Sequence, residues 1–141
     1  MKRYLFAIIS RVGMAAYSRF PVFGSLRASV AVIRDAELVL VIERSDGRGL
    51  SFPGGLAFPW EPAEHALSRE VAEETGLSVK TAIALFSYYA SDELPCTITV
   101  FAVEAEGKLR ESWEGSPKWL SVNDLRTGLI KSQQPIVERI G

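Results

Sequence analysis

Apolar segments separated by turn residues indicate a β-sheet in this chain. The runs 29–33 and 38–42 flank Asp35-Ala36, which predicts two strands joined by a tight turn. Longer runs at 79–90 and 97–105 are further strand candidates, and the second is rich in the β-branched residues that favour strands. We therefore expect a sheet of several strands.

Helical periodicity replaces this pattern at residues 61–75. The predicted helix ends at Gly76, a residue suited to the left-handed conformation that closes helices. Pro53-Gly54-Gly55, before it, ends a short extended segment. A helix inserted between strands favours an α/β fold whose sheet is covered on both faces.

The C-terminal third alternates between polar and apolar segments. Residues 106–117 are polar and predict an exposed loop, followed by a short closing strand at 119–122 and a helical turn at 123–125. Pro135 fits the first turn of a C-terminal helix that contains Ile136, Val137 and Ile140.

The N-terminal segment differs from the rest in charge. Every charged residue among the first 34 is basic, although the whole chain carries a net charge of −1. Apolar residues recur there at helical spacing and predict a basic amphipathic helix within residues 1–24. Its apolar residues are Leu5, Ile9, Val12, Ala16 and Phe20. We expect this helix to pack on the domain, to form a homodimer, or to lie on an anionic membrane surface.

Length and composition fit one globular domain over residues 25–141, with 48% hydrophobic and 23% charged residues in a chain of 141. Cys96 is the single cysteine, which excludes an intrachain disulfide and is compatible with a cytoplasmic protein. His65 is the single histidine. A hydrolase built from this chain therefore has to use carboxylates and a metal ion rather than a cysteine–histidine or serine–histidine pair.

Three glutamates share one face of the predicted helix. Glu70, Glu73 and Glu74 have i, i+3, i+4 spacing, at which like charges destabilise a helix. A divalent cation would relieve that repulsion, and oxygen ligands favour Mg²⁺ or Mn²⁺ over Zn²⁺. Taken alone, the three acids would also fit a solvated surface helix.

The glutamates belong to a wider pattern, Gly-x5-Glu-x7-Arg-Glu-U-x-Glu-Glu-x-Gly-U, in which U is aliphatic. Its positions here are Gly55, Glu61, Arg69, Glu70, Val71, Glu73, Glu74, Gly76 and Leu77. The pattern resembles the signature of the Nudix hydrolases, and all nine positions match at a chance of roughly one in a billion per start. The resemblance implies an α/β/α sandwich around a mixed β-sheet and Mg²⁺-dependent hydrolysis of a pyrophosphate bond by metal-activated water, with Mn²⁺ as a possible substitute.

The resemblance also implies roles for these residues. Glu73 and Glu74 would be metal ligands, Glu70 would be a ligand or the general base, and Gly55 would let the backbone pass close to the metal. Arg69 would orient the catalytic carboxylates. Glu61 would be a stabilising carboxylate beside the metal site.

Residues outside the signature extend the resemblance to MutT-type enzymes. Glu114, ahead of Trp119, would be a further metal ligand or the base; Glu111, Asp92 and Glu93 are rivals for that place. Gln133 stands where an asparagine reads the purine base, and Arg44 matches a phosphate-binding arginine. Trp60 replaces a common glycine and either packs on its loop or stacks on a nucleobase.

These residues predict a Nudix pyrophosphohydrolase that acts on a small nucleotide, with a nucleoside triphosphate as the first choice, and forms no stable complex with nucleic acid. Alternative substrates are ADP-ribose, a dinucleoside polyphosphate or an RNA 5′ end. A second class is a nucleotide-binding Nudix module without catalysis. The intact set of acids favours the enzyme.

Overall fold

The computed structural model describes residues 26–92 and 95–141. The predicted N-terminal helix, its dimer or membrane contact, and Glu93 lie outside these residues. Within the described ranges, no helix has the length and apolar character needed to cross a membrane.

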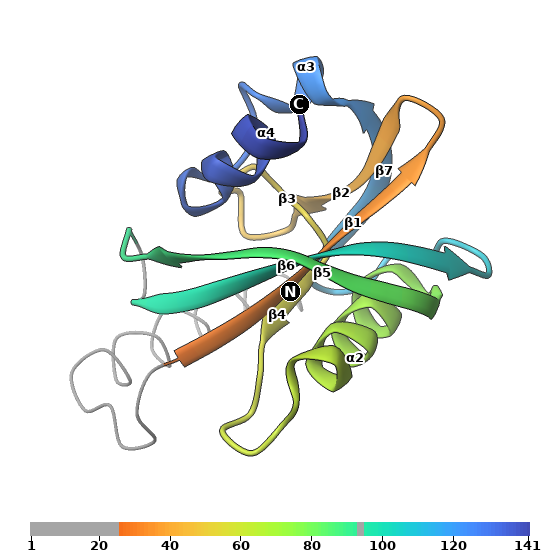
Figure 1. Cartoon of the computed structure of the whole chain (residues 1–141). Coiled ribbons are helices and arrows are strands. Elements are labelled where there is room, and N and C mark those ends of the chain that lie inside the picture. Colours follow the sequence, from red (N-terminus) through yellow and green to blue (C-terminus); the bar gives the residue numbers. More distant parts are fainter. Residues whose placement is uncertain (1–25, 93–94) are drawn as a thin grey trace.

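A mixed seven-stranded sheet forms the centre of the domain (Figure 1). Its main path has the order β3-β2-β1-β6-β5, while β4 pairs with β1 and β7 pairs with β2. Only the β1–β6 pair is parallel among the strand pairs of the described residues. The strands are β1 (Leu26–Asp35), β2 (Leu38–Arg44), β3 (Leu50–Ser51), β4 (Gly54–Leu56), β5 (Ser78–Ala90), β6 (Cys96–Glu106) and β7 (Gly115–Ser121).

Helices cover both faces of this sheet, as the sequence predicts. Figure 1 shows α2 on one side of the strands and α3 and α4 on the other. The helical elements are α2 (Ala63–Thr75), α3 (Val122–Leu125), the 3-10 helix η1 (Lys131–Gln133) and α4 (Gln134–Ile140). The α/β/α arrangement is therefore confirmed for the described residues.

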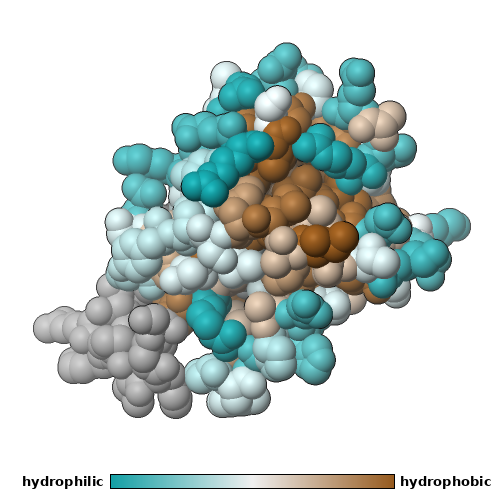
Figure 2. Space-filling view, in the orientation of Figure 1, coloured by the Kyte–Doolittle hydropathy of each residue, from teal (hydrophilic) through white to brown (hydrophobic). Residues whose placement is uncertain are grey.

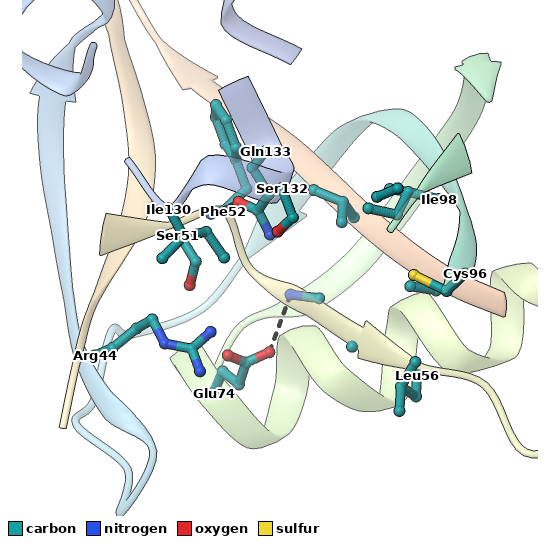
Figure 3. A pocket seen from close by; sticks show the side chains of 15 residues that line it. Arg44, Ser51, Phe52, Leu56, Glu74, Cys96, Ile98, Ile130, Ser132 and Gln133 are labelled. Atoms are coloured by element: carbon teal, nitrogen blue, oxygen red, sulfur yellow. Dashed lines mark hydrogen bonds between the residues drawn. The ribbon is translucent and has the colours of Figure 1, made fainter. Parts of the chain in front are cut away.

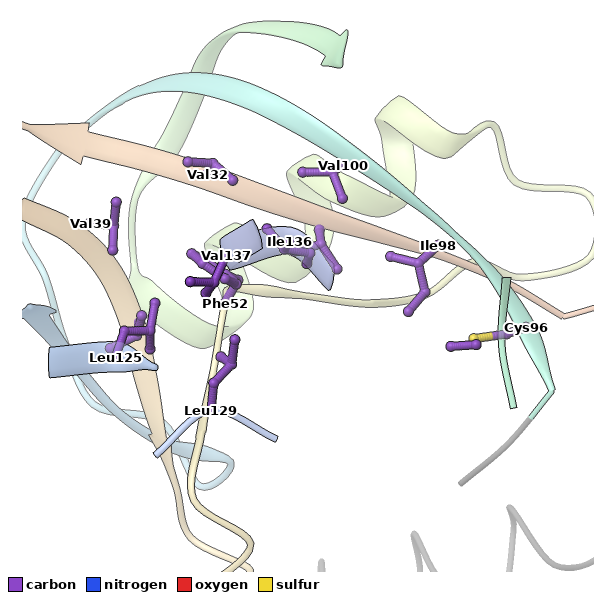
Figure 4. Close-up of a cluster of buried hydrophobic side chains, with 13 residues drawn as sticks. Val32, Val39, Phe52, Cys96, Ile98, Val100, Leu125, Leu129, Ile136 and Val137 are labelled. Atoms are coloured by element: carbon purple, nitrogen blue, oxygen red, sulfur yellow. The ribbon is translucent and has the colours of Figure 1, made fainter. Parts of the chain in front are cut away.

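Strand β1 is apolar on both faces because each face packs on a different helix layer. Val32 shares a core with Ile136 and Val137 of α4 (Figure 4), and Val30 belongs to the same core. The alternate residues of β1, Ala31 and Ile33, pack with Leu67 and Val71 of α2. The first core therefore holds α4 against the sheet, and the second holds α2.

The boundaries of α2 follow local chemistry. Pro62 is the N-cap residue, and Gly76 closes the helix at φ 81° while its N–H donates to the carbonyl oxygen of Ala72. Predicted strands 79–90 and 97–105 and the Pro135 helix start are also confirmed.

The prediction of a loop at 106–117 is wrong for its last three residues, which belong to a strand. Strand β7 already begins at Gly115 and pairs with β2 as far as Ser121. Its first residues are polar, but pairing with β2 supplies their backbone with partners. Pro117 is compatible with this strand because β7 pairs with β2 alone among the described strands, and proline is tolerated on a sheet edge.

Apolar residues also reach the surface at β5, the end strand of the main path. Ile83, Leu85 and Tyr89 of this strand are exposed. Figure 2 shows apolar residues gathered in the middle of the visible face. The domain therefore presents apolar surface to solvent along this edge.

Candidate metal and nucleotide site

Glu74 lies at the buried side of α2. The residue is only 6% exposed, and its Oε1 accepts a hydrogen bond of 2.9 Å from the backbone N–H of Gly54. Its position follows from the helix: Leu67, Glu70, Val71 and Glu74 have i, i+3, i+4, i+7 spacing, so they share one stripe. The stripe that packs on the sheet thus also carries two carboxylates.

Gly55 accommodates the second of these carboxylates. A Cβ atom at this position would lie 2.6 Å from the Cδ of Glu70 and 2.8 and 2.9 Å from its oxygens. Any other residue would force the Glu70 carboxylate to move, so glycine lets Glu70 lie against the backbone of β4. The role of Gly55 at a metal site stays a prediction.

Glu114 completes a cluster with Glu70 and Glu74. One oxygen of each of the three carboxylates lies within 4.8 Å of the others. Glu114 reaches this place because it immediately precedes β7. Its predicted rivals make other contacts: Glu111 accepts a hydrogen bond from Ser116, and Asp92 pairs with Lys131.

Glu73 stands apart from this cluster. Its side chain is 53% exposed, and Oε2 lies 3.7 Å from Nη1 of Arg69. The charge of Glu73 nevertheless raises the pKa of Glu70 and of Glu114. The structure therefore brings together three of the four predicted carboxylate ligands and places the fourth toward solvent.

Burial and mutual repulsion make ionisation of the three carboxyl groups unfavourable. Burial, followed by the charge of Glu114, raises the pKa of Glu70 to about 7. Burial and neighbouring carboxylates also raise the pKa of Glu74 and of Glu114. A hard divalent cation suits this site because it takes oxygen ligands and would stabilise all three ionised groups.

Arg69 binds one carboxylate of the cluster and one beside it. Its Nε and Nη2 donate to the two oxygens of Glu61 at 3.0 and 2.8 Å, and its Nη1 donates to Glu70 at 2.9 Å. The hydrogen bonds from Arg69 are the main reason that the pKa of Glu61 falls to about 2. The guanidinium also lies 4.5 Å from the ring centroid of Phe58. This geometry agrees with the orienting role expected for Arg69 and the stabilising role expected for Glu61.

A cavity of about 210 Å³ opens beside Glu74 (Figure 3). Apolar side chains form part of its lining, including Val30 and Ile98 of the sheet and Phe52 between β3 and β4. Arg44 and Gln133 supply polar groups. An apolar cavity with a few polar groups next to a carboxylate cluster has the character of a small-molecule site.

The amide of Gln133 has a defined orientation in this cavity. Gln133 is buried, and its Oε1 accepts a 2.8 Å hydrogen bond from the backbone N–H of Phe52. A backbone N–H can only donate, so the partner atom has to be the amide oxygen. The Nε2 group is then the part of the side chain that is left to donate to a ligand.

Trp60 lies outside the cavity lining. It is 79% exposed and stacks on Phe58, with ring centroids 5.8 Å apart and an interplanar angle of 14°. This geometry matches the expectation that Trp60 packs on its own loop. The nucleobase-stacking alternative stays a prediction.

Sequence reasoning missed two residues with clear contacts here. Phe52 fixes the Gln133 amide through its backbone, a contact across 81 positions that no local pattern reveals. Asp46 binds the Arg44 guanidinium. It lies in a polar, glycine-containing turn, and an aspartate is common in such turns without any functional role.

Comparison with known proteins places this geometry in a family. The family model for the NUDIX domain matches residues 25–140. The chain belongs to the Nudix family. The match includes the signature helix and the Gln133 segment, so the family and Nudix hydrolase assignments made from the signature are confirmed.

Solved Nudix structures share the fold. A MutT NUDIX hydrolase from Burkholderia pseudomallei is similar with a TM-score of 0.74 and 22% identity, over 82% of this chain and 97% of that one. The ORF135 protein of E. coli is similar with a TM-score of 0.70 and 24% identity, over 81% of this chain and 86% of that one. At these identities the likeness establishes the fold alone.

A sequence relative matches over a shorter segment. YtkD of Bacillus subtilis (strain 168), provisionally named an 8-oxo-dGTP diphosphatase, is 51% identical over 49 residues. These residues cover 35% of this chain and 30% of YtkD, so the Nudix chain matches less than a third of that protein's length.

Proposed function

We propose that this Nudix protein hydrolyses a pyrophosphate bond of a nucleotide, with a nucleoside triphosphate as its substrate and Mg²⁺ as its cofactor. One observation carries the proposal. The convergence of Glu70, Glu74 and Glu114 lies next to a cavity that also contains Arg44 and Gln133. The cavity would hold the nucleoside, and its phosphates would extend toward the carboxylates.

The cluster would hold the cation through Glu70, Glu74 and Glu114, with Gly55 providing room for the carboxylate of Glu70. When bound, Mg²⁺ neutralises phosphate charge and lowers the pKa of a coordinated water. Glu73, on the solvent side of the same helix, would add a carboxylate for a cation held with the phosphates. Mn²⁺ has similar ligand preferences and would substitute.

The residues around the cluster would orient the substrate and accept the proton of the attacking water. Glu70 and Glu114 are both candidates for the base, because each would offer one oxygen to the cation and keep the other to accept the proton. Arg69 would keep Glu70 aimed at the water. Arg44 would bind phosphate oxygens by charge-assisted hydrogen bonds.

Gln133 supports a preference among bases. Because Nε2 is the free end of its amide, the side chain would donate to an acceptor such as a keto oxygen of the base. Guanine and its oxidised form carry such oxygens, whereas adenine presents an amino group at the same ring position. The name of the YtkD relative agrees with this preference.

A nucleotide panel tests the proposed function. With Mg²⁺, we expect cleavage of nucleoside triphosphates to the monophosphate and pyrophosphate, with guanine substrates faster than adenine substrates, measured by chromatography of the nucleotide products. Excess EDTA should stop the reaction, and Mn²⁺ added in excess of EDTA should restore it.

Other outcomes would contradict specific parts of the proposal. Faster cleavage of ADP-ribose, a dinucleoside polyphosphate or a triphosphorylated RNA end would identify that compound as the substrate and refute the nucleoside triphosphate. Tight nucleotide binding with no cleavage in either metal would identify a non-catalytic module. Cleavage that persists in excess EDTA would refute the proposed dependence on Mg²⁺.

A further inference from the structure

Asp46 is an acidic residue outside the carboxylate cluster, and its contacts converge on Arg44. It lies in the turn between β2 and β3, yet its side chain is only 4% exposed. Its Oδ1 accepts hydrogen bonds from Nε of Arg44 at 3.1 Å and from the backbone N–H of Arg48 at 3.0 Å. Its Oδ2 accepts from Nη2 of Arg44 at 2.5 Å. Both side-chain hydrogen bonds of this buried carboxylate thus go to the Arg44 guanidinium, while Nε of Arg48 lies farther away, 4.0 Å from Oδ2.

Arg44 lines the cavity as well as binding Asp46. Asp46 occupies the edge formed by Nε and Nη2. Figure 3 shows the guanidinium directed toward the Glu74 carboxylate. The positive charge of Arg44 also acts to lower the pKa of Glu74 and of Glu114, although burial outweighs it at both groups. Arg44 is therefore close enough to the cluster to reach phosphates bound there.

We propose that Asp46 is a positioning residue that holds Arg44 in the orientation needed to bind the phosphates of the nucleotide. The inference rests on the proposed function, in which Arg44 contacts phosphate. An unrestrained arginine side chain samples many rotamers, and binding would otherwise have to remove that entropy. Asp46 removes that freedom before the nucleotide arrives, so the arginine is preorganised.

Asp46 also limits a competing contact. A guanidinium released from Asp46 would be attracted to Glu74 and Glu114, the ligands expected to bind the cation. Opposite charges in a partly buried site attract strongly, so this pairing would compete with cation binding. The position of Asp46, on the far edge of the guanidinium, opposes that movement.

The variant Asp46→Asn tests this role with little change in the turn. The asparagine oxygen can still accept from the Arg48 N–H, but its amide nitrogen cannot accept from Arg44. We expect the dissociation constant of a non-hydrolysable α,β-imido GTP analogue, measured by calorimetry in Mg²⁺, to rise about tenfold or more, because misplacing a binding group costs this order of affinity. Asp46→Glu should recover part of the loss. Asp124→Asn, an exposed aspartate in α3, is the matched control and should leave the constant unchanged.

A double-mutant cycle separates positioning from other effects. In an Arg44→Ala background, Asp46→Asn should change the dissociation constant by less than twofold, because the residue it positions is gone. The same tenfold loss in that background would overturn the inference. So would an unchanged constant for Asp46→Asn together with a lower melting temperature, which would show a purely structural role.

The cycle also distinguishes failure of the inference from failure of the proposed function. Tight binding that Arg44→Ala weakens, combined with additive effects of the two substitutions, would reject only the role of Asp46. Binding that Arg44→Ala leaves unchanged would reject the phosphate role of Arg44, and the inference with it. Absence of any binding by the wild-type protein would contradict both.

Discussion

Glu74→Gln should reduce the rate of nucleotide hydrolysis by about 10³-fold, because the substitution removes a charged ligand from the cluster that stabilises the reacting phosphates. It should also raise the melting temperature of the metal-free protein at neutral pH. Burial, followed by the charges of Glu114 and Glu70, raises the pKa of Glu74. Glutamine has a similar size and can still accept the Gly54 N–H bond, so the change removes repulsion without opening a cavity.

Steady-state kinetics and thermal melts with and without Mg²⁺ measure both effects. Glu64→Gln is the matched control, since Glu64 is an exposed glutamate in the first turn of the same helix. It should keep wild-type kinetics. Retained turnover in Glu74→Gln would refute the metal site. A large fall in melting temperature would show instead that Glu74 serves the fold.

The metal-free protein should lose thermal stability as the pH rises from 4.5 to 7. Glu70 has a pKa of about 7 in the folded protein against an ordinary value of 4.5, so the folded state binds more protons than the unfolded state in this range. The stabilisation is complete below pH 4.5 and is lost as the pH rises through 7. It amounts to about 3 kcal/mol for Glu70, and the melting temperature should fall by roughly 10 °C. Glu74 and Glu114 act in the same direction.

Other acids do not reverse this trend. The pKa of Glu61 is lowered to about 2, so its opposing contribution lies between pH 2 and 4.5. Scanning calorimetry in EDTA across pH 4.5–8 measures the dependence, which Glu70→Gln should weaken. Mg²⁺ should restore stability, and by more at pH 8 than at pH 5, because it binds the ionised carboxylates. A flat profile for the metal-free wild-type protein would show that the pKa of Glu70 is not raised in the folded state.

Local patterns predicted the signature helix because its determinants are close together in the chain. Gly76 closes α2, and Leu67 and Val71 bury its apolar side. The sequence also indicates which of the three glutamates lie on the buried side of the helix and which is exposed. Glu70 and Glu74 continue the buried stripe of Leu67 and Val71, whereas Glu73 lies off it, and the exposure of Glu73 follows from that spacing.

Features that depend on contacts between residues far apart in the sequence could not be predicted from local patterns. The start of β7 at Gly115 is set by pairing with Arg44 of β2, although its own polar residues indicate a loop. The orientation of Gln133 depends on a hydrogen bond from Phe52, which is distant in the sequence. The role inferred for Asp46 depends on the position of Arg44 in the cavity lining. Contacts of this kind form when the sheet assembles, so composition and periodicity do not contain them.

Binding of Mn²⁺, followed by electron paramagnetic resonance of the free ion, tests the central claim without relying on any substrate. The wild-type protein should remove Mn²⁺ from solution at a site that Mg²⁺ competes for, and the triple variant Glu70→Gln, Glu74→Gln, Glu114→Gln should lose this binding while its circular dichroism stays that of the wild type. Equal Mn²⁺ binding by the folded triple variant would contradict the assignment of these three carboxylates as the metal site.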